Sequence, residues 1–481
     1  MIPPMSSPRL LVLFFAFLAL YAAGDWALPL VDRDEPRFAE ASREMLEPGR
    51  DFIVPYFNNQ PRYDKPPLIY WLQDAAYKIF GENEFAARLP SAVCGALATV
   101  MVALWGSQLY DPKTGWRAAV MFGLCAQTIV HAHAAVADMA MIAASTASAW
   151  AGWNWLQTRT LRWWLAFWGL LAVGFLAKGP IAWVPIGMAG WAAAGMKRNY
   201  RQGRPGALEW TLGVVLMLAI VGVWGVPAML QTHGEFAAVG LGKHVIMRSV
   251  APLEGHGAAT WLIYAATFPF YFVTVWPSFF PWSLWLPAVA AGLWRRKKQL
   301  WPEEKYLLTG IVLVFGIFTL SRTKLPHYTL PAFPFMALLV GAWWGTERKK
   351  ALTWAAGGMA AFGLALALVA FPLARPLFVS QSLYDEAAPW LTPKMELGTV
   401  GYHEPSLVWL FRKKIGGFAT SMNWKDADLW MHQPGPRVCV MPVDQFEKAF
   451  RNVDPAWRVV KARGVNVANA RRVELAAVIK I

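Results

Sequence analysis

The sequence predicts a mainly α-helical, polytopic membrane protein with a small C-terminal soluble α/β domain. Of its 481 residues, 56% are hydrophobic and only 16% are charged, which is too apolar for a soluble protein of this size. Apolar runs of about 20 residues, the length that crosses a bilayer as helix, recur from residue 9 to residue 372. In residues 373–481, charged residues return and short β-rich runs alternate with helical patterns. We therefore expect a transmembrane domain over 1–372, which includes a long loop at 31–88, and an α/β domain over 373–481.

The apolar runs predict about 11–13 transmembrane helices by their length. The candidate spans are residues 9–30, 89–109, 115–133, 135–156, 163–178, 180–196, 209–230, 263–294, 306–321, 327–346 and 351–372. The run 263–294 contains four prolines, which predicts one broken helix or additional crossings. Residues 10–23 also resemble a cleavable signal peptide, but the ten spans that follow favour an uncleaved first helix.

Clusters of lysine and arginine predict the orientation of these helices. With a cytoplasmic N-terminus, every second connection is cytoplasmic, and each of these connections is basic, as the positive-inside rule requires. The basic connections are residues 113–117, 159–162, 197–204, 295–298 and 348–350. The loop 31–88, the loop 231–262, the turn 321–326 and the C-terminal domain then lie on the opposite, extracytoplasmic side.

The net charge of +15 does not indicate a nucleic-acid partner, because the basic residues sit in short clusters between apolar runs. We expect them to orient helices and to contact anionic membrane lipids. Cys94, Cys125 and Cys439 are scattered, so they predict neither a disulfide framework nor a cysteine metal site.

An acidic segment, Asp32-Arg33-Asp34-Glu35-Pro36-Arg37, follows the first candidate span directly. A carboxylate here, from Asp34 or Glu35, can act as a general base toward an acceptor hydroxyl or hold a divalent cation that bridges a phosphate. The alternative is a structural role, in which the carboxylates cap a helix and pair with Arg33 or Arg37.

A lysine presented by a rigid turn comes next, in Tyr63-Asp64-Lys65-Pro66-Pro67. The two prolines restrict the backbone after Lys65, and an amphipathic aromatic helix follows. Its ammonium group then suits the phosphate of a lipid-linked substrate. The alternative is that Lys65 extends to lipid headgroups.

Asp138 and Lys178 each interrupt an apolar block of about two helix lengths. Such a break predicts a tight turn between two spans, and Gly179-Pro180 supplies the turn residues after Lys178. Isolated charges between spans are usually functional, although this pair can also be a salt bridge that joins two hairpins. His131 and His133 are two residues apart, on different helix faces, so we do not expect both to bind one metal ion.

A second basic turn, Ser321-Arg322-Thr323-Lys324, precedes His327 and Tyr328. Arg322 and Lys324 add two cations that can neutralise an anionic leaving group, with phospholipid headgroup binding as the alternative. Ionisable groups at membrane depth usually line a cavity or pair with one another, so we expect one polar cavity at the extracytoplasmic face. The ionisable candidates at that face are Asp34, Glu35, Lys65, Arg88, Asp138, Lys178, His256, Arg322, Lys324 and His327.

Five sequence strings, read in order, resemble the membrane glycosyltransferases of the protein-mannosyltransferase and aminoarabinose-transferase superfamily. They are Asp34-Glu35-Pro36-Arg37-Phe38-Ala39-Glu40, Asp64-Lys65-Pro66-Pro67, Asn83-Glu84-Phe85-Ala86-Ala87-Arg88-Leu89-Pro90-Ser91, Ala177-Lys178-Gly179-Pro180 and Lys324-Leu325-Pro326-His327-Tyr328. Each is weak alone, but together they are specific. Asp64 departs from the family pattern, because the aminoarabinose enzymes usually have Glu before Lys-Pro-Pro.

The resemblance implies the C-type glycosyltransferase fold and an inverting transfer of a sugar from undecaprenyl phosphate, at the periplasmic face of a bacterial inner membrane. It places Asp34 in the catalytic-acid position, Asp138 as the second acid, and Lys65 and Lys178 near the carrier phosphate. The expected acceptor is lipid A or another envelope glycan. We also expect a monomer, with no certain cofactor and no assigned metal ligands; the acidic residues permit Mg²⁺ or Mn²⁺ without requiring it.

The remaining expectations complete the predicted site. Glu35 joins the catalytic carboxylates; Arg37, Arg88, Arg322 and Lys324 join the phosphate-binding cations; substrate contacts are expected from Tyr63, His256, His327 and Tyr328. Three other functions stay open at this point. A protein O-mannosyltransferase-like enzyme would use the same site on a protein acceptor. A transporter or flippase of lipid-linked sugars would need polar groups reachable from both faces, whereas these gather on one. A purely structural role leaves the one-sided charges without a use.

Overall fold

The computed structural model describes residues 6–195, 204–240, 242, 261–344 and 349–481, and the chain divides into two compact units. The first unit comprises Met1–Ala23, Tyr63–Ile69 and Leu89–Leu364, and the second comprises Gly24–Arg62, Tyr70–Arg88 and Ala365–Ile481. The loop 31–88 therefore contributes to both units.

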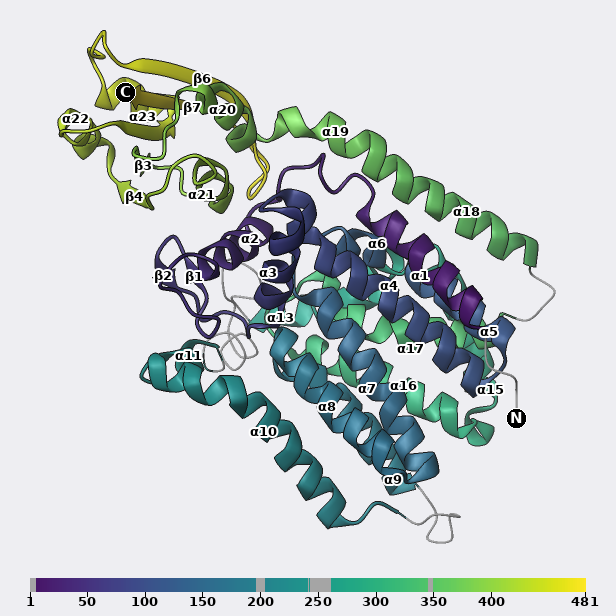
Figure 1. Ribbon diagram of the computed structural model, residues 1–481. Helices are drawn as coiled ribbons and strands as arrows, with labels where there is room; N and C mark the ends of the chain where they lie inside the picture. Colours follow the sequence, from purple (N-terminus) through teal and green to yellow (C-terminus); the bar gives the residue numbers. More distant parts are fainter. Residues whose placement is uncertain (1–5, 196–203, 241, 243–260, 345–348) are drawn as a thin grey trace. The chain divides into compact units, whose positions relative to one another are not determined.

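The first unit is a bundle of helices (Figure 1). The helices with residues in it are α1 (Ser7–Ala22), α4 (Glu84–Leu109), α5 (Pro112–Gly123), α6 (Ala126–Ala132), α7 (Asp138–Thr158), α8 (Leu161–Lys178), α9 (Val184–Gly195), α10 (Ala207–Gln231), α11 (Glu235–Ala237), α13 (Trp261–Ala266), α14 (Phe270–Ser278), α15 (Leu286–Arg295), α16 (Pro302–Leu320), α17 (Phe333–Trp343) and α18 (Lys349–Ala365). Short 3-10 segments lie between them: η1 (Pro180–Trp183), η3 (Trp282–Trp285), η4 (Lys297–Gln299) and η5 (Pro326–Ala332).

The hairpin of α7 and α8 brings two distant charges to one end of the bundle. Arg159 ends α7 in the left-handed conformation, at φ 54°, and α8 starts two residues later. The two helices pack against each other, so the first residue of α7, Asp138, lies beside the last residue of α8, Lys178. An anion at a helix N-terminus and a cation at a C-terminus are each stabilised by the helix dipole.

Glycines allow close helix packing elsewhere in the bundle, as is common in membranes. A Cβ atom on Gly106 of α4 would lie 2.8 Å from the Gly115 Cα of α5. A Cβ atom on Gly213 of α10 would lie 1.9 Å from the Trp168 ring of α8. In both places a side chain would force the helices apart.

Four helices of the described chain are long and apolar enough to cross a membrane: Glu84–Leu109, Leu161–Lys178, Ala207–Gln231 and Lys350–Leu377. A fifth is reached if Ile263–Ser278 and Trp282–Arg295, which meet at 115°, are one broken span. That break confirms the disruption expected from the prolines of residues 263–294. Several of the predicted spans are divided in the structure: residues 115–133 form α5 and α6, and residues 180–196 begin with η1.

The second unit combines part of the loop 31–88 with the C-terminal residues. Its N-terminal elements are α2 (Asp34–Met45), the strands β1 (Tyr56–Phe57) and β2 (Gln60–Pro61), and most of α3 (Leu68–Phe80). Its C-terminal helices are α19 (Phe371–Ala374), α20 (Val379–Ala387), α21 (Pro405–Phe411), α22 (Trp424–His432) and α23 (Val443–Ala449), with the π segment η6 (Leu366–Ala370) and the 3-10 turns η7 (Arg375–Leu377) and η8 (Ala388–Trp390). Helix α2 packs against α21, from the other end of the sequence.

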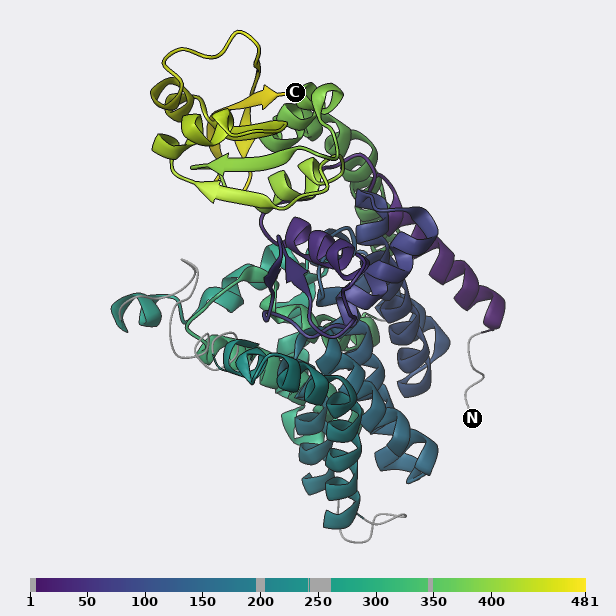
Figure 2. The ribbon, with the colours of Figure 1, turned by 60° about the vertical axis from the view of Figure 1, so that its left-hand side comes forward.

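A five-stranded sheet forms the centre of the C-terminal part (Figure 2). Its strands are β3 (Glu396–Val400), β4 (Ala419–Met422), β5 (Arg437–Pro442), β6 (Arg458–Asn466) and β7 (Arg471–Lys480), in the order β4-β3-β5-β7-β6. The strand β3 is parallel to β4 and β5, whereas β7 is antiparallel to β5 and β6. The predicted small α/β domain is confirmed.

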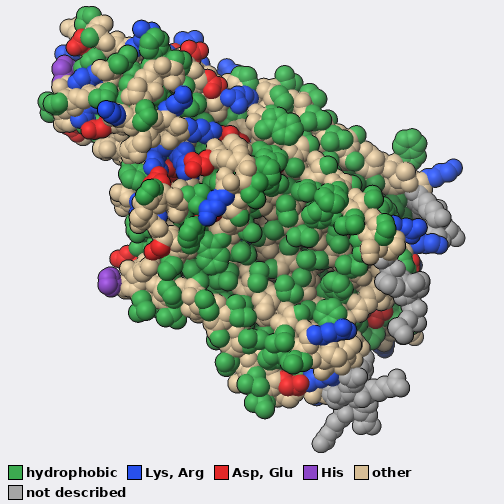
Figure 3. Space-filling view, in the orientation of Figure 1, with side chains coloured by type: hydrophobic (Ala, Val, Ile, Leu, Met, Phe, Trp, Pro, Cys, Tyr) green, Lys and Arg blue, Asp and Glu red, His purple; other side chains and the backbone are tan. Residues whose placement is uncertain are grey.

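The surface of each unit agrees with its composition (Figure 3). Hydrophobic side chains cover the visible face of the helical unit, and large ones such as Leu212, Val223 and Leu230 of α10 are exposed. On the C-terminal part, basic and acidic side chains are interspersed. A lipid environment stabilises the first kind of surface and water the second. The predicted mainly α-helical membrane class is thus confirmed.

Candidate functional site

A cavity of about 460 Å³ lies in the first unit, at the end of the α7–α8 hairpin where Asp138 and Lys178 meet. Its walls are mostly apolar, with Phe175, Val221 and Trp224 among them. Residues with ionisable side chains from four parts of the chain line it as well, among them Tyr63, Asp64, Lys65, Asp138, Lys178, His327 and Tyr328. A few convergent polar groups in an apolar cavity are typical of a ligand-binding site.

The Lys178 Nζ atom donates a hydrogen bond to Asp138 Oδ1 at 2.5 Å. Both side chains are largely buried, with 17% and 9% of their surfaces exposed. The salt bridge between hairpins that the sequence left open is therefore present. It does not exclude a ligand role, because both residues also line the cavity.

Lys65 reaches the same cavity from the turn before α3. It is half-buried, and its Nζ donates to the carbonyl oxygen of Asp64 at 3.2 Å. Tyr63, two residues earlier, packs edge-on against Phe236, with ring centroids 5.5 Å apart. The structure therefore brings Lys65 and Lys178, two of the six predicted phosphate-binding cations, to one apolar cavity.

The basic turn after α16 divides between two roles. Ser321, Thr323, His327 and Tyr328 line the cavity. Lys324 instead donates to the carbonyl oxygens of Thr319, Ser321 and Phe318 at 2.8, 2.9 and 3.3 Å, with only 8% of its surface exposed. Those carbonyls end α16, so Lys324 caps the helix.

The two remaining candidates of this face are Arg322 and His256. The Arg322 guanidinium lies 5.9 Å from the Tyr264 ring, as a cation–π pair. Phosphate binding by Arg322 and Lys324 stays a prediction. His256 lies outside the described residues.

Apart from Tyr63 and Lys65, the predicted residues of the loop 31–88 belong to the second unit. Glu35 and Arg88 form a bidentate ion pair, with Arg88 Nε to Glu35 Oε1 at 2.9 Å and Arg88 Nη2 to Glu35 Oε2 at 2.7 Å. Arg88 also donates to the carbonyl oxygens of Asp25, Leu28 and Pro29, and only 1% of its side chain is exposed. This pair therefore anchors the segment that leads into α2.

Asp34 and Arg37 have a different environment. Asp34 is the first residue of α2 and is exposed, whereas Arg37, one turn later, is half-buried. A carboxylate at this position interacts favourably with the helix dipole and keeps its oxygens accessible. The catalytic roles of Asp34, Glu35 and Asp138 stay predictions.

Comparisons with known proteins agree with this architecture. The family model described as dolichyl-phosphate-mannose-protein mannosyltransferase matches residues 64–225, which include the cavity residues Lys65, Asp138 and Lys178. A crystal structure of ArnT from Cupriavidus metallidurans bound to undecaprenyl phosphate superposes with a TM-score of 0.75, covering 98% of each chain at 20% identity. This similarity shows the fold.

Two curated relatives from Pseudomonas fluorescens extend the match. Undecaprenyl phosphate-alpha-4-amino-4-deoxy-L-arabinose arabinosyl transferase 2 is 30% identical over 70% of this chain and 55% of its own length. Transferase 1 of the same name is 28% identical over 78% of this chain and 67% of its own length. The chain is thus similar in sequence to these membrane glycosyltransferases, and it shares the fold of the superposed ArnT structure. It spans a little over half the length of the first of these relatives.

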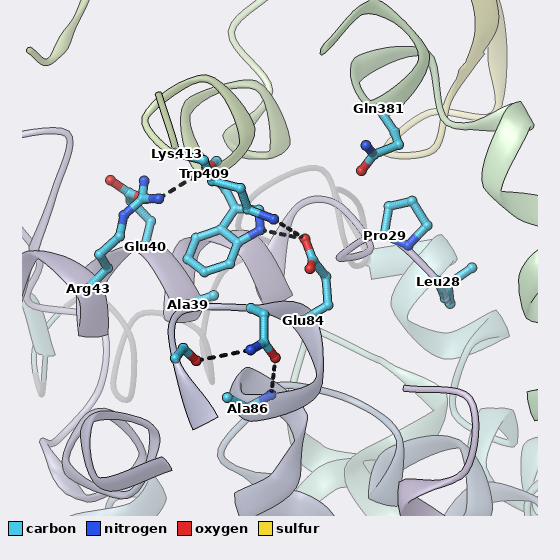
Figure 4. A network of polar contacts seen from close by, with 12 residues as sticks. Leu28, Pro29, Ala39, Glu40, Arg43, Glu84, Ala86, Gln381, Trp409 and Lys413 are labelled. Atoms are coloured by element: carbon cyan, nitrogen blue, oxygen red, sulfur yellow. Dashed lines mark hydrogen bonds and ion pairs between the residues drawn. The ribbon is translucent and has the colours of Figure 1, made fainter. Parts of the chain in front are cut away.

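The local sequence patterns gave no sign of the polar network of the second unit, part of which Figure 4 shows. Arg412 forms ion pairs with Glu40 and Glu44 of α2 and with Glu47, which follows that helix. Glu84 accepts from the Trp409 indole at 3.1 Å and from Lys413 at 2.6 Å. The partners lie more than 300 residues apart in sequence, and no local pattern signals such pairs.

A second missed network surrounds Asp32. Its two carboxylate oxygens accept from the backbone N–H and the hydroxyl of Ser406, at 2.8 and 2.5 Å. Burial raises the pKa of Asp32 to about 6, and the Ser406 hydrogen bonds oppose that rise. The neighbouring Arg33 pairs with Glu404 at 3.0 Å. These contacts hold α2 to the start of α21.

Proposed function

We propose that this chain is an inverting glycosyltransferase that moves a sugar from a polyprenyl phosphate, of the undecaprenyl class, onto an extracytoplasmic acceptor. The observation that carries the proposal is the mostly apolar cavity that Lys65 and Lys178 line together. Such a cavity suits the phosphate and the first isoprene units of a lipid carrier. The names of the curated relatives, which specify undecaprenyl phosphate and an aminoarabinose unit, support the same donor class.

The chemistry follows from these charges. An acceptor oxygen attacks the anomeric carbon from the face opposite the phosphate, and the bond between that carbon and the phosphate oxygen breaks. The phosphate leaves with the electron pair, and Lys65 and Lys178 stabilise its charge. If the acceptor is a hydroxyl, its proton passes to a carboxylate, for which Asp34 is the candidate. If the acceptor is a phosphate of lipid A, it is already ionised, and Asp34 positions it instead.

The acceptor and the side of the membrane belong to this proposal as well. Lipid A or another envelope glycan is the acceptor we favour, because the curated relatives are arabinosyl transferases. The family model, described by a protein mannosyltransferase, keeps a protein acceptor as the alternative. The basic connections between the helices support a periplasmic site in a bacterial inner membrane.

Substitution of Lys65 tests the proposal directly. Purified enzyme in lipid is assayed with undecaprenyl-phosphate sugars and lipid A, and mass spectrometry detects the product. Lys65→Met is expected to lower kcat/KM by about 10²–10³, as removal of one transition-state donor does, while Lys65→Arg retains part of the activity. Lys113→Met, at an exposed lysine outside the cavity, serves as the matched control.

Two results would contradict this function. One is unchanged transfer by both Lys65→Met and Lys178→Met. The other is identical lipid A and envelope glycans in cells with and without the protein. Labelling of cysteines at positions 65 and 178 from the cytoplasm would instead favour a transporter, because a transporter site must open to both sides.

A further inference from the structure

Two histidines and an aspartate from separate segments converge beside the Asp138–Lys178 ion pair. His131 comes from α6, Asp138 starts α7 and His327 lies in η5. Each of these three elements packs against the other two. One potential ligand atom from each residue lies within 4.8 Å of the others. The His131 and His327 ring centroids are 5.0 Å apart.

We propose that His131, Asp138 and His327 bind a zinc ion. Two imidazoles and one carboxylate are the ligand types of catalytic zinc sites, which keep a fourth position open. Tetrahedral zinc with bonds of about 2.0–2.1 Å sets ligand atoms about 3.4 Å apart, so closure requires side-chain adjustments of about an ångström. Mg²⁺ prefers oxygen ligands, so two imidazoles favour zinc over the magnesium that acidic residues alone would suggest.

A second residue is placed to orient one ligand. The side-chain amide of Gln127 lies 2.8 Å from His131 Nδ1, one helical turn away. The amide nitrogen of Gln127 is the atom placed toward the ring; with the amide turned by 180°, its oxygen accepts a hydrogen bond from Nδ1–H, and His131 then binds the metal through Nε2. Metal-binding histidines commonly have such a partner, which fixes the tautomer and the ring orientation.

The ion pair with Lys178 is compatible with this site. Lys178 engages Oδ1 of Asp138, and a carboxylate has a second oxygen that can bind a metal. Asp138 is 6% exposed, and it lines the cavity together with His327. A zinc ion here would place two positive charges beside Lys178. Its open position suits a phosphate oxygen, and this last step alone rests on the proposed function.

Zinc binding is measured on the full-length chain in detergent, by metal analysis after gel filtration and by competition with a chromophoric chelator. The wild-type protein is expected to hold about one zinc ion per chain. His131→Gln and His327→Gln should each weaken zinc binding by more than about 100-fold, and Gln127→Leu by about 10–100-fold. His133→Gln, next to the site but outside the cluster, is the matched control and should retain zinc.

A spectroscopic test does not depend on loss of binding, so it still applies if a histidine variant fails to fold. Co²⁺ in the wild-type site should give the visible absorption of a tetrahedral ion. In His327→Cys, thiolate ligation should add a charge-transfer band, because cysteine also binds these metals. Absence of zinc binding by the wild type, retention of zinc by both histidine-to-glutamine variants, or preference for Mg²⁺ over Zn²⁺ would overturn the proposal. These assays need no turnover, so they distinguish a missing zinc site from a wrong assignment of function.

Discussion

Asp74 of α3 is a buried carboxylate whose replacement should stabilise the second unit in a pH-dependent way. The residue is 3% exposed, and within the described part of the chain neither of its oxygens has a hydrogen-bond partner. Burial raises its pKa from 3.8 to about 8, although the charge of Lys78 opposes that rise. An isolated buried carboxylate prefers the protonated form, so the folded chain holds a proton that the unfolded chain releases.

The size of the effect follows from this shift. Because the pKa is raised in the folded state, stability is highest below pH 3.8 and is lost as the pH rises toward 8. At about 1.4 kcal/mol per pKa unit, ionisation of Asp74 lowers the free energy of unfolding, relative to its value at low pH, by roughly 2 kcal/mol at pH 5 and roughly 5 kcal/mol at pH 8. Asp74→Asn removes the titration but leaves a buried amide, which costs about 1–3 kcal/mol at every pH.

The informative quantity is therefore the difference in the free energy of unfolding between Asp74→Asn and the wild type, measured as a function of pH. We expect the free energy of unfolding of Asp74→Asn, relative to wild type, to rise by about 3 kcal/mol between pH 5 and pH 8. Unfolding of the purified protein in detergent, followed by tryptophan fluorescence, measures it. Asp444→Asn, at an exposed carboxylate of α23, should change stability by less than about 0.5 kcal/mol at both pH values. A constant difference across this range would refute the reasoning.

Two further predictions concern packing and charge. Arg88→Met leaves the buried Glu35 carboxylate without its cation and should lower the free energy of unfolding by about 3–5 kcal/mol. The double variant Arg88→Met/Glu35→Gln should recover part of that loss. Equal stability of the single and double variants in thermal unfolding would contradict a charge-based cause. Gly213→Val places a side chain against Trp168 and should destabilise the chain by about 1–3 kcal/mol. Gly222→Ala on the same helix, where the added Cβ atom meets only one atom at 3.9 Å, should leave stability unchanged. The melting temperatures of the two variants and the wild type in detergent measure both effects.

The residues around the cavity show which contacts a local sequence pattern predicts and which it does not. Lys178 and Asp138 each interrupt an apolar run, and a charge in such a run predicts a turn and a pairing near the membrane face. Both features are present. Lys324 shows what such a pattern leaves out: its position in a basic turn predicts a phosphate contact, which stays a prediction, but it does not predict the hydrogen bonds of its ammonium group to the carbonyls that end α16. The direction of a side chain depends on neighbours that the local sequence does not specify.

The sequence did not predict the histidine cluster or the polar network of the second unit, for a related reason. The sequence sets His131 beside His133, whereas in the structure potential ligand atoms of His131, Asp138 and His327 lie within 4.8 Å of one another. Arg412 pairs with carboxylates of α2, which begins at residue 34. Pairs so distant in sequence meet only when several helices have packed, so periodicity carries no information about them.

The sequence by itself determined the solvent of each part of this protein. Long apolar runs require a bilayer, interrupted only where charges or prolines make continuation costly, and the return of charge after residue 372 requires water. Only the tertiary structure decided which charges neutralise one another and which project into the cavity. Hydrophobicity is a property of each residue and its near neighbours, whereas an ion pair or a ligand set depends on distances of a few ångströms between segments that folding alone brings together.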